Sequence, residues 1–249
     1  MRLSVLDQSI AVAGRPQDLS IRNTVALAQH CEALGYERFW VSEHHNHPTI
    51  VGTAPEIVIA AIAATTKSIR IGSAGIMLPH YSPFKVAEVF RVLDALAPGR
   101  IDLGLGRAPG SDGRTAFALH PMANERPEHF PSDVRDLIAW LHDEPMVQGH
   151  PFAAVKAYPH TDTAPEVWIL GSSDYGAQVA ALFGLPYCYA WFFSDGAFRT
   201  LDGQLHASWF GLYADLVEPW CGRPLAQLFE VNFVLTSSTV VRPPSTVRS

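Results

Sequence analysis

Short apolar runs alternate along this chain with longer segments whose apolar residues recur at helical spacing. The short runs predict strands, and they cover Leu3–Leu6, Glu37–Val41, 68–78, 100–106, 166–170, 186–193 and 228–236. The longer segments predict helices, and they cover Leu19–Leu34, Thr53–Thr65, 82–100, 132–143, 172–184 and 196–217. Strands and helices that alternate this often indicate parallel strands joined by helical crossovers.

Local signals support several of these boundaries. Ser82 stands where its side chain can cap the helix that begins at Pro83, and Gly184 is placed to close a later helix. Residues 107–131 form a loop-rich stretch that precedes the helix predicted over 132–143.

The element order suits a TIM-barrel-like fold, because an eight-stranded barrel usually needs roughly 250 residues and this chain has 249. An open doubly wound sheet is the alternative. We favour the barrel, since polar residues follow nearly every predicted strand. The pattern offers seven strands, and Pro243–Pro244 exclude a helix interior near the end. We therefore expect an incomplete barrel domain over 1–238 and an irregular tail over 239–249.

Composition narrows the class of protein. The chain is 48% hydrophobic with a net charge of −6 and has no block of Lys and Arg, so we expect no nucleic-acid partner. Its three cysteines form no C-x-x-C pair, which indicates a reduced, cytoplasmic protein. Asp7 and Gln8 interrupt the first apolar run too early for a signal peptide. No segment approaches the roughly 20 apolar residues that span a membrane.

The segment "SEHHNHP", residues 42–48, places His44, His45 and His47 just after a predicted strand. On an extended strand, His45 and His47 would share one side, which is the pattern of a metal-dependent hydrolase barrel. Beyond Asp174, the later strand ends offer few further ligands. The other interpretations are solvent-facing loop histidines or an acid–base group, since imidazole titrates near neutral pH.

The segment "RIDLGLGRAPGSD", residues 100–112, places Gly104 and Gly106 on one strand face. Their missing side chains leave space for a flat ligand or for a close backbone. Arg107 follows at the strand end, where it suits a phosphate group or a surface salt bridge. The dinucleotide fingerprint fails, because Pro109 stands where the third glycine belongs.

Two later strand ends also carry candidate chemistry. Ser172 and Ser173 open a predicted helix, whose first N–H groups form an anion site or receive an ordinary serine cap. Trp191 belongs to an aromatic strand end, which suits either the wall of a flat cofactor or plain core.

Taken in order, these motifs resemble the bacterial luciferase-like family of flavin-dependent monooxygenases. The resemblance covers most of residues 1–235 and rests on "LSVLDQS", "RFWVSEHHN", "AGIMLPHYSPFKVAEVFRVLDALAPGRIDLGLGRAPGSD" and "WILGSSDYGAQVAALFGLP". It implies a barrel that binds reduced FMN and uses molecular oxygen on a small organic substrate. Because the sequence shows no nicotinamide-binding fingerprint, we expect reduced FMN to come from a separate flavin reductase. The open sheet edge favours a homodimer.

The resemblance also implies roles for individual residues. His44 matches the active-site histidine, and His45 is its neighbour in the motif. The remaining matches are cofactor-binding residues: Ala74 and Gly75 at a non-prolyl cis peptide beneath the flavin, Arg107, Ser172 and Ser173 at the phosphate, and Trp191 near the ring. We add Gly104 and Gly106 to the cofactor-binding residues, because their strand face leaves space for a flat ring.

The chain departs from the family at several points. Gly176 stands where relatives usually place a hydroxyl residue near the phosphate, and His47 is not a usual feature. The last strand and helices of the family have no counterpart here. A flavin-binding protein without turnover is therefore one alternative function, and the metal-dependent hydrolase is another.

Overall fold

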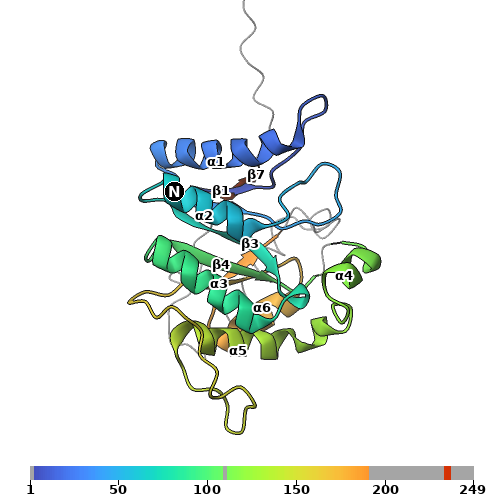
Figure 1. Cartoon of the computed structure of the whole chain (residues 1–249), viewed down its shortest axis with the longest axis vertical. Coiled ribbons are helices and arrows are strands. Elements are labelled where there is room, and N and C mark those ends of the chain that lie inside the picture. The colour runs from blue at the N-terminus through green and yellow to red at the C-terminus, as the bar shows by residue number, and fades with distance from the viewer. Residues whose placement is uncertain (1–2, 109–110, 191–232, 237–249) are drawn as a thin grey trace, which may run out of the picture.

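The computed structural model describes residues 3–108, 111–190 and 233–236. Seven strands form one parallel sheet in the order β6-β5-β4-β3-β2-β1-β7 (Figure 1). The strands are β1 (Leu3–Asp7), β2 (Arg38–Val41), β3 (Arg70–Met77), β4 (Ile101–Gly106), β5 (Glu166–Gly171), β6 (Tyr187–Tyr189) and β7 (Phe233–Thr236). Consecutive strands from β1 to β6 are neighbours, as in a TIM-barrel-like fold.

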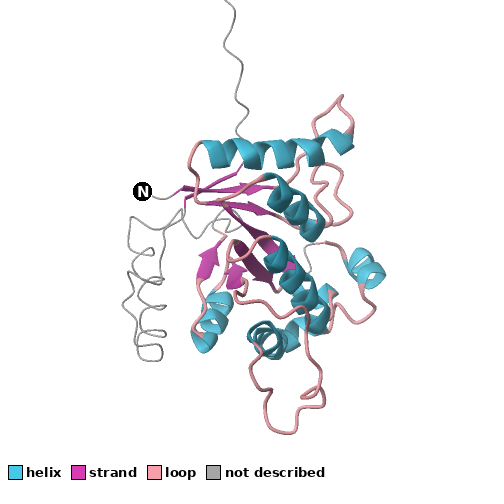
Figure 2. Ribbon diagram, turned by 60° about the vertical axis from the view of Figure 1, so that its left-hand side comes forward, coloured by secondary structure: helices cyan, strands magenta, loops and turns pink. Residues whose placement is uncertain are grey.

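Helices follow the strands and lie along one face of the curved sheet (Figure 2). They are α1 (Gln17–Ala33), α2 (Pro55–Thr65), α3 (Pro83–Leu96), α4 (Gly113–Leu119), α5 (Phe130–His142) and α6 (Asp174–Phe183), with short 3₁₀ turns η1 (Leu78–His80) and η2 (Arg126–His129). None of these helices has the length and apolar character needed to cross a bilayer.

Alternation along the strands separates two apolar clusters. The larger cluster packs strand residues such as Phe39, Ile71 and Leu103 against the helices. The smaller cluster contains Leu6, Trp40 and Trp168, which belong to the alternate positions of their strands. The second set therefore faces the concave side, which is the interior of a barrel.

A buried charge network ties the amino-terminal ends of three strands together. Asp102 is fully buried and accepts hydrogen bonds from Arg38 Nη1 at 2.9 Å, from Trp40 Nε1 at 2.8 Å and from Arg70 Nε at 2.9 Å. This network lies at the strand ends opposite the histidine segment, so that it supports the sheet rather than the candidate site.

The expected strand–helix repeat and its incomplete barrel are confirmed. One local expectation is wrong: Ser82 stands at the start of α3, but its side chain makes no cap hydrogen bond. The loop-rich stretch 107–131 also contains two short elements, α4 and η2. Asp112 explains α4, because its side chain accepts hydrogen bonds from the backbone of Arg114 and Thr115. The expected helix over 196–217, the tail over 239–249 and Trp191 lie outside the described residues.

Candidate active site

The predicted site residues gather at the carboxyl ends of the parallel strands. His44 and His45 follow β2, Arg107 follows β4, and Ser172 follows β5. Because parallel strands end at the same edge, these three segments, far apart in sequence, meet on one side of the sheet.

His44 is half-buried just beyond β2. Burial and then the neighbouring His47 lower the pKa of the His44 imidazole, against a smaller opposite effect of Glu43. Its Nδ1 atom is buried and has no hydrogen-bond partner within the described residues. His44 is therefore a neutral imidazole near neutral pH, with a ring nitrogen that can accept a proton.

The expectation that His45 and His47 share one side is wrong. Asn46 between them has a positive φ of 51°, so the backbone there is not an extended strand. His45 Nε2 lies 2.6 Å from Glu43 Oε1, whereas His47 Nδ1 accepts the N–H of Ile50 at 3.0 Å. Among residues 3–108, 111–190 and 233–236, no three His, Cys, Asp or Glu side chains are placed to hold a metal ion.

The Ala74–Gly75 peptide is cis, as the resemblance implied. The pairing of β3 with β4 shifts register between Ser73 and Ile76 at this point. The Ser73 hydroxyl restores the lost pairing, because Oγ donates to Gly104 O at 2.9 Å and accepts from Gly104 N at 3.1 Å. The bulge is therefore fixed by a buried side chain of the same strand.

Gly104 and Gly106 differ in the space that they leave. A Cβ at Gly104 would clash with the Ser73 carbonyl oxygen and would lie 2.6 Å from Leu170 Cδ1. A Cβ at Gly106 would come no closer than 3.8 Å to Ile76 O. The close-backbone interpretation thus holds at Gly104, while Gly106 leaves open space.

Arg107 points toward the first turn of α6. Its guanidinium carbon lies 4.0 Å from the centroid of the Tyr175 ring, two residues beyond Ser173. Ser172 and Ser173 are exposed, and Ser173 stands at the N-cap of α6 without a side-chain cap hydrogen bond. A cation, two hydroxyl groups and a helix start are therefore brought together.

Tyr187 on β6 supports the turn that carries the two serines. Its hydroxyl lies 2.9 Å from Gly171 O and 3.0 Å from Ser173 O. A Cβ at buried Gly176 would lie 2.9 Å from Tyr187 Cε2. The glycine that departs from the family pattern thus makes room for a tyrosine ring that holds the turn from below.

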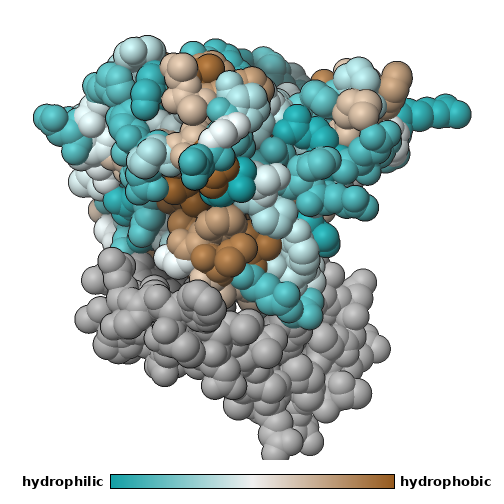
Figure 3. Space-filling view, turned by 90° about the horizontal axis from the view of Figure 1, so that it is seen from below, coloured by the Kyte–Doolittle hydropathy of each residue, from teal (hydrophilic) through white to brown (hydrophobic). Residues whose placement is uncertain are grey.

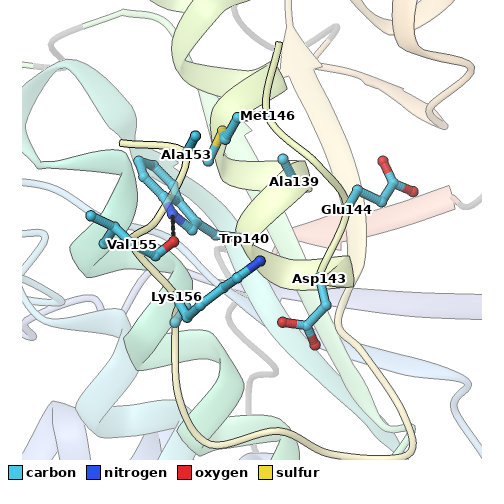
Figure 4. Close-up of a pocket in the computed structure, with 9 residues that line it drawn as sticks. Ala139, Trp140, Asp143, Glu144, Met146, Ala153, Val155 and Lys156 are labelled. Carbon is cyan, nitrogen blue, oxygen red and sulfur yellow. Dashed lines mark hydrogen bonds between the residues drawn. The ribbon is translucent and has the colours of Figure 1, made fainter. Parts of the chain in front are cut away.

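Two surface cavities lie away from these residues. One, of about 10 Å³, is enclosed by α5 and the returning chain, where Trp140 Nε1 donates to Val155 O (Figure 4); it has room for about one water molecule. The other, of about 400 Å³, lies between α5 and α6 and includes Leu182 and Phe183. Figure 3 shows apolar residues gathered on the face seen from below. Neither cavity is lined by a predicted site residue.

The sequence did not predict roles for Ser73, Tyr175 or Tyr187. Tyr175 and Gly176 were visible in the motif that opens α6, and the unusual glycine was the available signal for a large neighbour. The partner of that glycine comes from the next strand, which no local pattern identifies.

The sequence profile of the family described as luciferase-like monooxygenase matches residues 1–201. The chain is 42% identical over 192 residues to N-acetyl-S-alkylcysteine monooxygenase from Bacillus subtilis (strain 168), covering 77% of this chain and 57% of that protein. It spans between 57% and 64% of the length of three curated relatives.

Solved structures show the same likeness. Apo-MsnO8 matches with a TM-score of 0.74 at 40% identity, covering 86% of this chain and 60% of that one. The oxygenating constituent of 3,6-diketocamphane monooxygenase from Pseudomonas putida, solved in complex with FMN, matches with a TM-score of 0.70 at 17% identity, covering 90% and 64%. At 17% identity, the match to the 3,6-diketocamphane enzyme shows a shared fold and nothing further.

Proposed function

Because the chain belongs to the luciferase-like monooxygenase family, we propose that it binds reduced FMN and uses molecular oxygen to oxidise a small organic substrate. The contact between Arg107 and Tyr175 carries this proposal, since it holds a cation beside the start of α6. His44 lies at the same edge of the sheet. One edge thus offers an anion-binding group and a proton-accepting group.

The donors at the start of α6 suit the phosphate of FMN. The N–H of Tyr175 is already bonded to Asp174 Oδ1 at 2.8 Å. The phosphate would therefore draw on the neighbouring N–H groups, the hydroxyls of Ser172 and Ser173, and Arg107. The FMN bound to the 3,6-diketocamphane enzyme supports this choice of ligand, because that protein shares the fold.

The ring of the cofactor would face the concave side of the sheet. Ala74, Gly75, Gly104 and Gly106 are the residues that we expect along it, and Trp191 remains a prediction. Gly106 leaves room for such a ring, whereas the missing side chain of Gly104 leaves room for the backbone of β3 at Ser73. Leu6, Trp40 and Trp168 make the same concave side apolar, which would help to exclude water.

Reduced flavin, when bound, supplies the electrons that activate oxygen. The protein supplies position and a proton acceptor, for which we assign His44 with His45 beside it. His44 would accept or return a proton at its buried Nδ1, because its lowered pKa keeps the ring neutral. Further parts of the proposal are a separate reductase as the source of reduced FMN, a homodimer and a cytoplasmic location.

The test supplies reduced FMN and oxygen to the whole chain, with an N-acetyl-S-alkylcysteine as the first candidate substrate because a relative is named for it. The rate of substrate oxidation is compared for wild type, His44→Ala and the control His142→Ala, an exposed histidine at the end of α5. We expect His44→Ala to lose roughly a hundredfold in rate and the control to match wild type.

Equal rates for wild type and His44→Ala would remove His44 from the reaction. Tight FMN binding without oxidation across a panel of thioethers and ketones would select the flavin-binding protein without turnover. Absence of FMN binding would reject both.

A further inference from the structure

Glu43, the residue before the two histidines, has a completely buried side chain. Its Oε1 accepts the hydroxyl of Tyr81 at 2.6 Å and lies 2.6 Å from His45 Nε2, while Oε2 accepts the N–H of Met77 at 2.9 Å. Both carboxylate oxygens therefore engage groups at the ends of β2 and β3.

The Tyr81 hydroxyl and the Met77 N–H show which ring nitrogen of His45 carries the proton. Burial and then the nearby Glu43 charge raise the pKa of Tyr81, so its phenol keeps its proton and donates it. The amide of Met77 can only donate. The carboxylate is thus an acceptor toward both, and an ionised carboxylate has no hydrogen of its own. His45 Nε2, beside the same Oε1, must then be the N–H nitrogen.

We propose that Glu43 is a positioning residue that fixes the proton of neutral His45 on Nε2 and leaves Nδ1 as the accepting nitrogen of that ring. A neutral imidazole has one donor and one acceptor nitrogen, so fixing one defines the other. The proton assignment rests on the three contacts of an ionised Glu43 and does not depend on the proposed function. Its value for the reaction rests on the proposed function, in which His45 stands beside His44.

Other titratable groups face this pair from neighbouring elements. Glu56 lies in the first turn of α2, and burial followed by the Glu43 charge raises its pKa. The ring of His80 in η1 lies 5.9 Å from that of His45. Within its own segment, His45 is flanked by His44 and His47. Of the described groups, Glu43 is the carboxylate bonded directly to His45.

Replacing Glu43 by Gln keeps the shape of the side chain and should move the proton of His45 to the other ring nitrogen. The amide oxygen can take the place of Oε2 and keep the N–H of Met77. The NH₂ group then stands where Oε1 was, and it donates to Tyr81 and to His45 Nε2. Nε2 becomes an acceptor, so that the proton of the neutral ring moves to Nδ1.

The test is nitrogen NMR of the whole chain labelled in its histidine rings, at a pH where His45 is neutral. A His45→Gln variant assigns the His45 signals by their loss. We expect wild type to show N–H at Nε2 and a bare nitrogen at Nδ1, and Glu43→Gln to show the reverse. Wild type with the proton on Nδ1 would overturn the proposal even if Glu43→Gln failed to fold.

Two matched variants separate the carboxylate from its surroundings. Tyr81→Phe removes one donor and keeps the carboxylate, and Glu56→Gln neutralises the second acid; both should keep the proton on Nε2. A tautomer change in either variant, or none in a folded Glu43→Gln, would contradict the role of Glu43.

A second readout keeps this inference apart from the proposed function. We expect Glu43→Gln to change FMN affinity less than about twofold, because Glu43 is not among the proposed phosphate or ring contacts, while oxidation of substrate falls at least roughly tenfold. If wild type binds no FMN, the proposed function fails and the NMR result still decides the tautomer. If wild type is active and Glu43→Gln matches it, the positioning role fails alone.

Discussion

The guanidinium of Arg107 lies over the ring of Tyr175, with 4.0 Å between the guanidinium carbon and the ring centroid. This contact joins the end of β4 to the first turn of α6. Stacking on an aromatic face leaves the edge N–H groups of a guanidinium available to an oxyanion. The contact thus orients a cation at the helix start that we assign to the phosphate of FMN.

Arg107→Ala is expected to weaken FMN binding by roughly ten- to a hundredfold, because one charged hydrogen-bonding partner of the phosphate is lost. Riboflavin, which lacks the phosphate, should bind the variant and wild type equally. Titration calorimetry with both ligands measures the effect. Arg22→Ala, which removes an exposed arginine of α1, is the control. An equal loss for riboflavin would show that Arg107 acts on the ring site or on the fold.

Tyr187→Phe should weaken FMN binding by roughly three- to tenfold without affecting riboflavin, since it removes a hydroxyl that holds two carbonyls of the serine turn. Gly176→Ala should act in the same way, because the new methyl group displaces the ring of Tyr187. The double variant should lose no more than the larger single loss. Fully additive losses in a double-mutant cycle would show that the two positions act separately.

His44 should make stability depend on pH in a defined window. Its pKa is lowered on folding, by burial and by His47, so below its ordinary value of 6.5 the unfolded chain binds the proton more readily. The free energy of unfolding should therefore fall as pH drops from that value toward the folded pKa. Urea unfolding of wild type and His44→Gln across this window checks the effect. An unchanged slope in the variant would assign the pH dependence to other groups.

Asp102→Asn should cost about 3 kcal/mol of unfolding free energy, because it removes the fully buried carboxylate that pairs with Arg38 and leaves that cation with the partly exposed Glu166, 3.2 Å away. Asp18→Asn, in an exposed pair on α1, is the control and should change the urea midpoint little. A small loss for Asp102→Asn would mean that Arg70 and Trp40 hold the strand ends together without the charge.

Gly104→Ala and Gly106→Ala form a matched pair on one strand. The first should lower the free energy of unfolding by about 1–3 kcal/mol, because its methyl group meets the Ser73 carbonyl and Leu170. The second should be nearly neutral, since its methyl group has space. Thermal or urea unfolding of both variants checks the contrast. Equal losses would indicate that strand propensity, rather than the bulge of β3, decides the cost.

The strand–helix repeat was predictable because each element carries its own period of apolar residues. Every predicted strand within the described residues is present, and the guanidinium of Arg107 lies against Tyr175 in the first turn of α6. The role of Arg107 and of the serine turn in binding a phosphate stays a prediction. Edge placement follows from parallel pairing, which the repeat itself implies.

Side-chain partners from other strands were not predictable in the same way. The direction of His47 depends on the positive φ of Asn46, and the fit of Gly176 depends on Tyr187 from the next strand. The sequence did not predict the short helix α4, because its start is defined by a single Asp112 cap rather than by a long apolar period.

The most direct test of the central claim is the binding of reduced FMN and reduced riboflavin to the whole chain without oxygen, measured by equilibrium dialysis. The account predicts that FMN binds at least roughly tenfold more tightly, because Arg107 and the serine turn engage its phosphate. Equal affinity for the two flavins, or binding of neither, would contradict it.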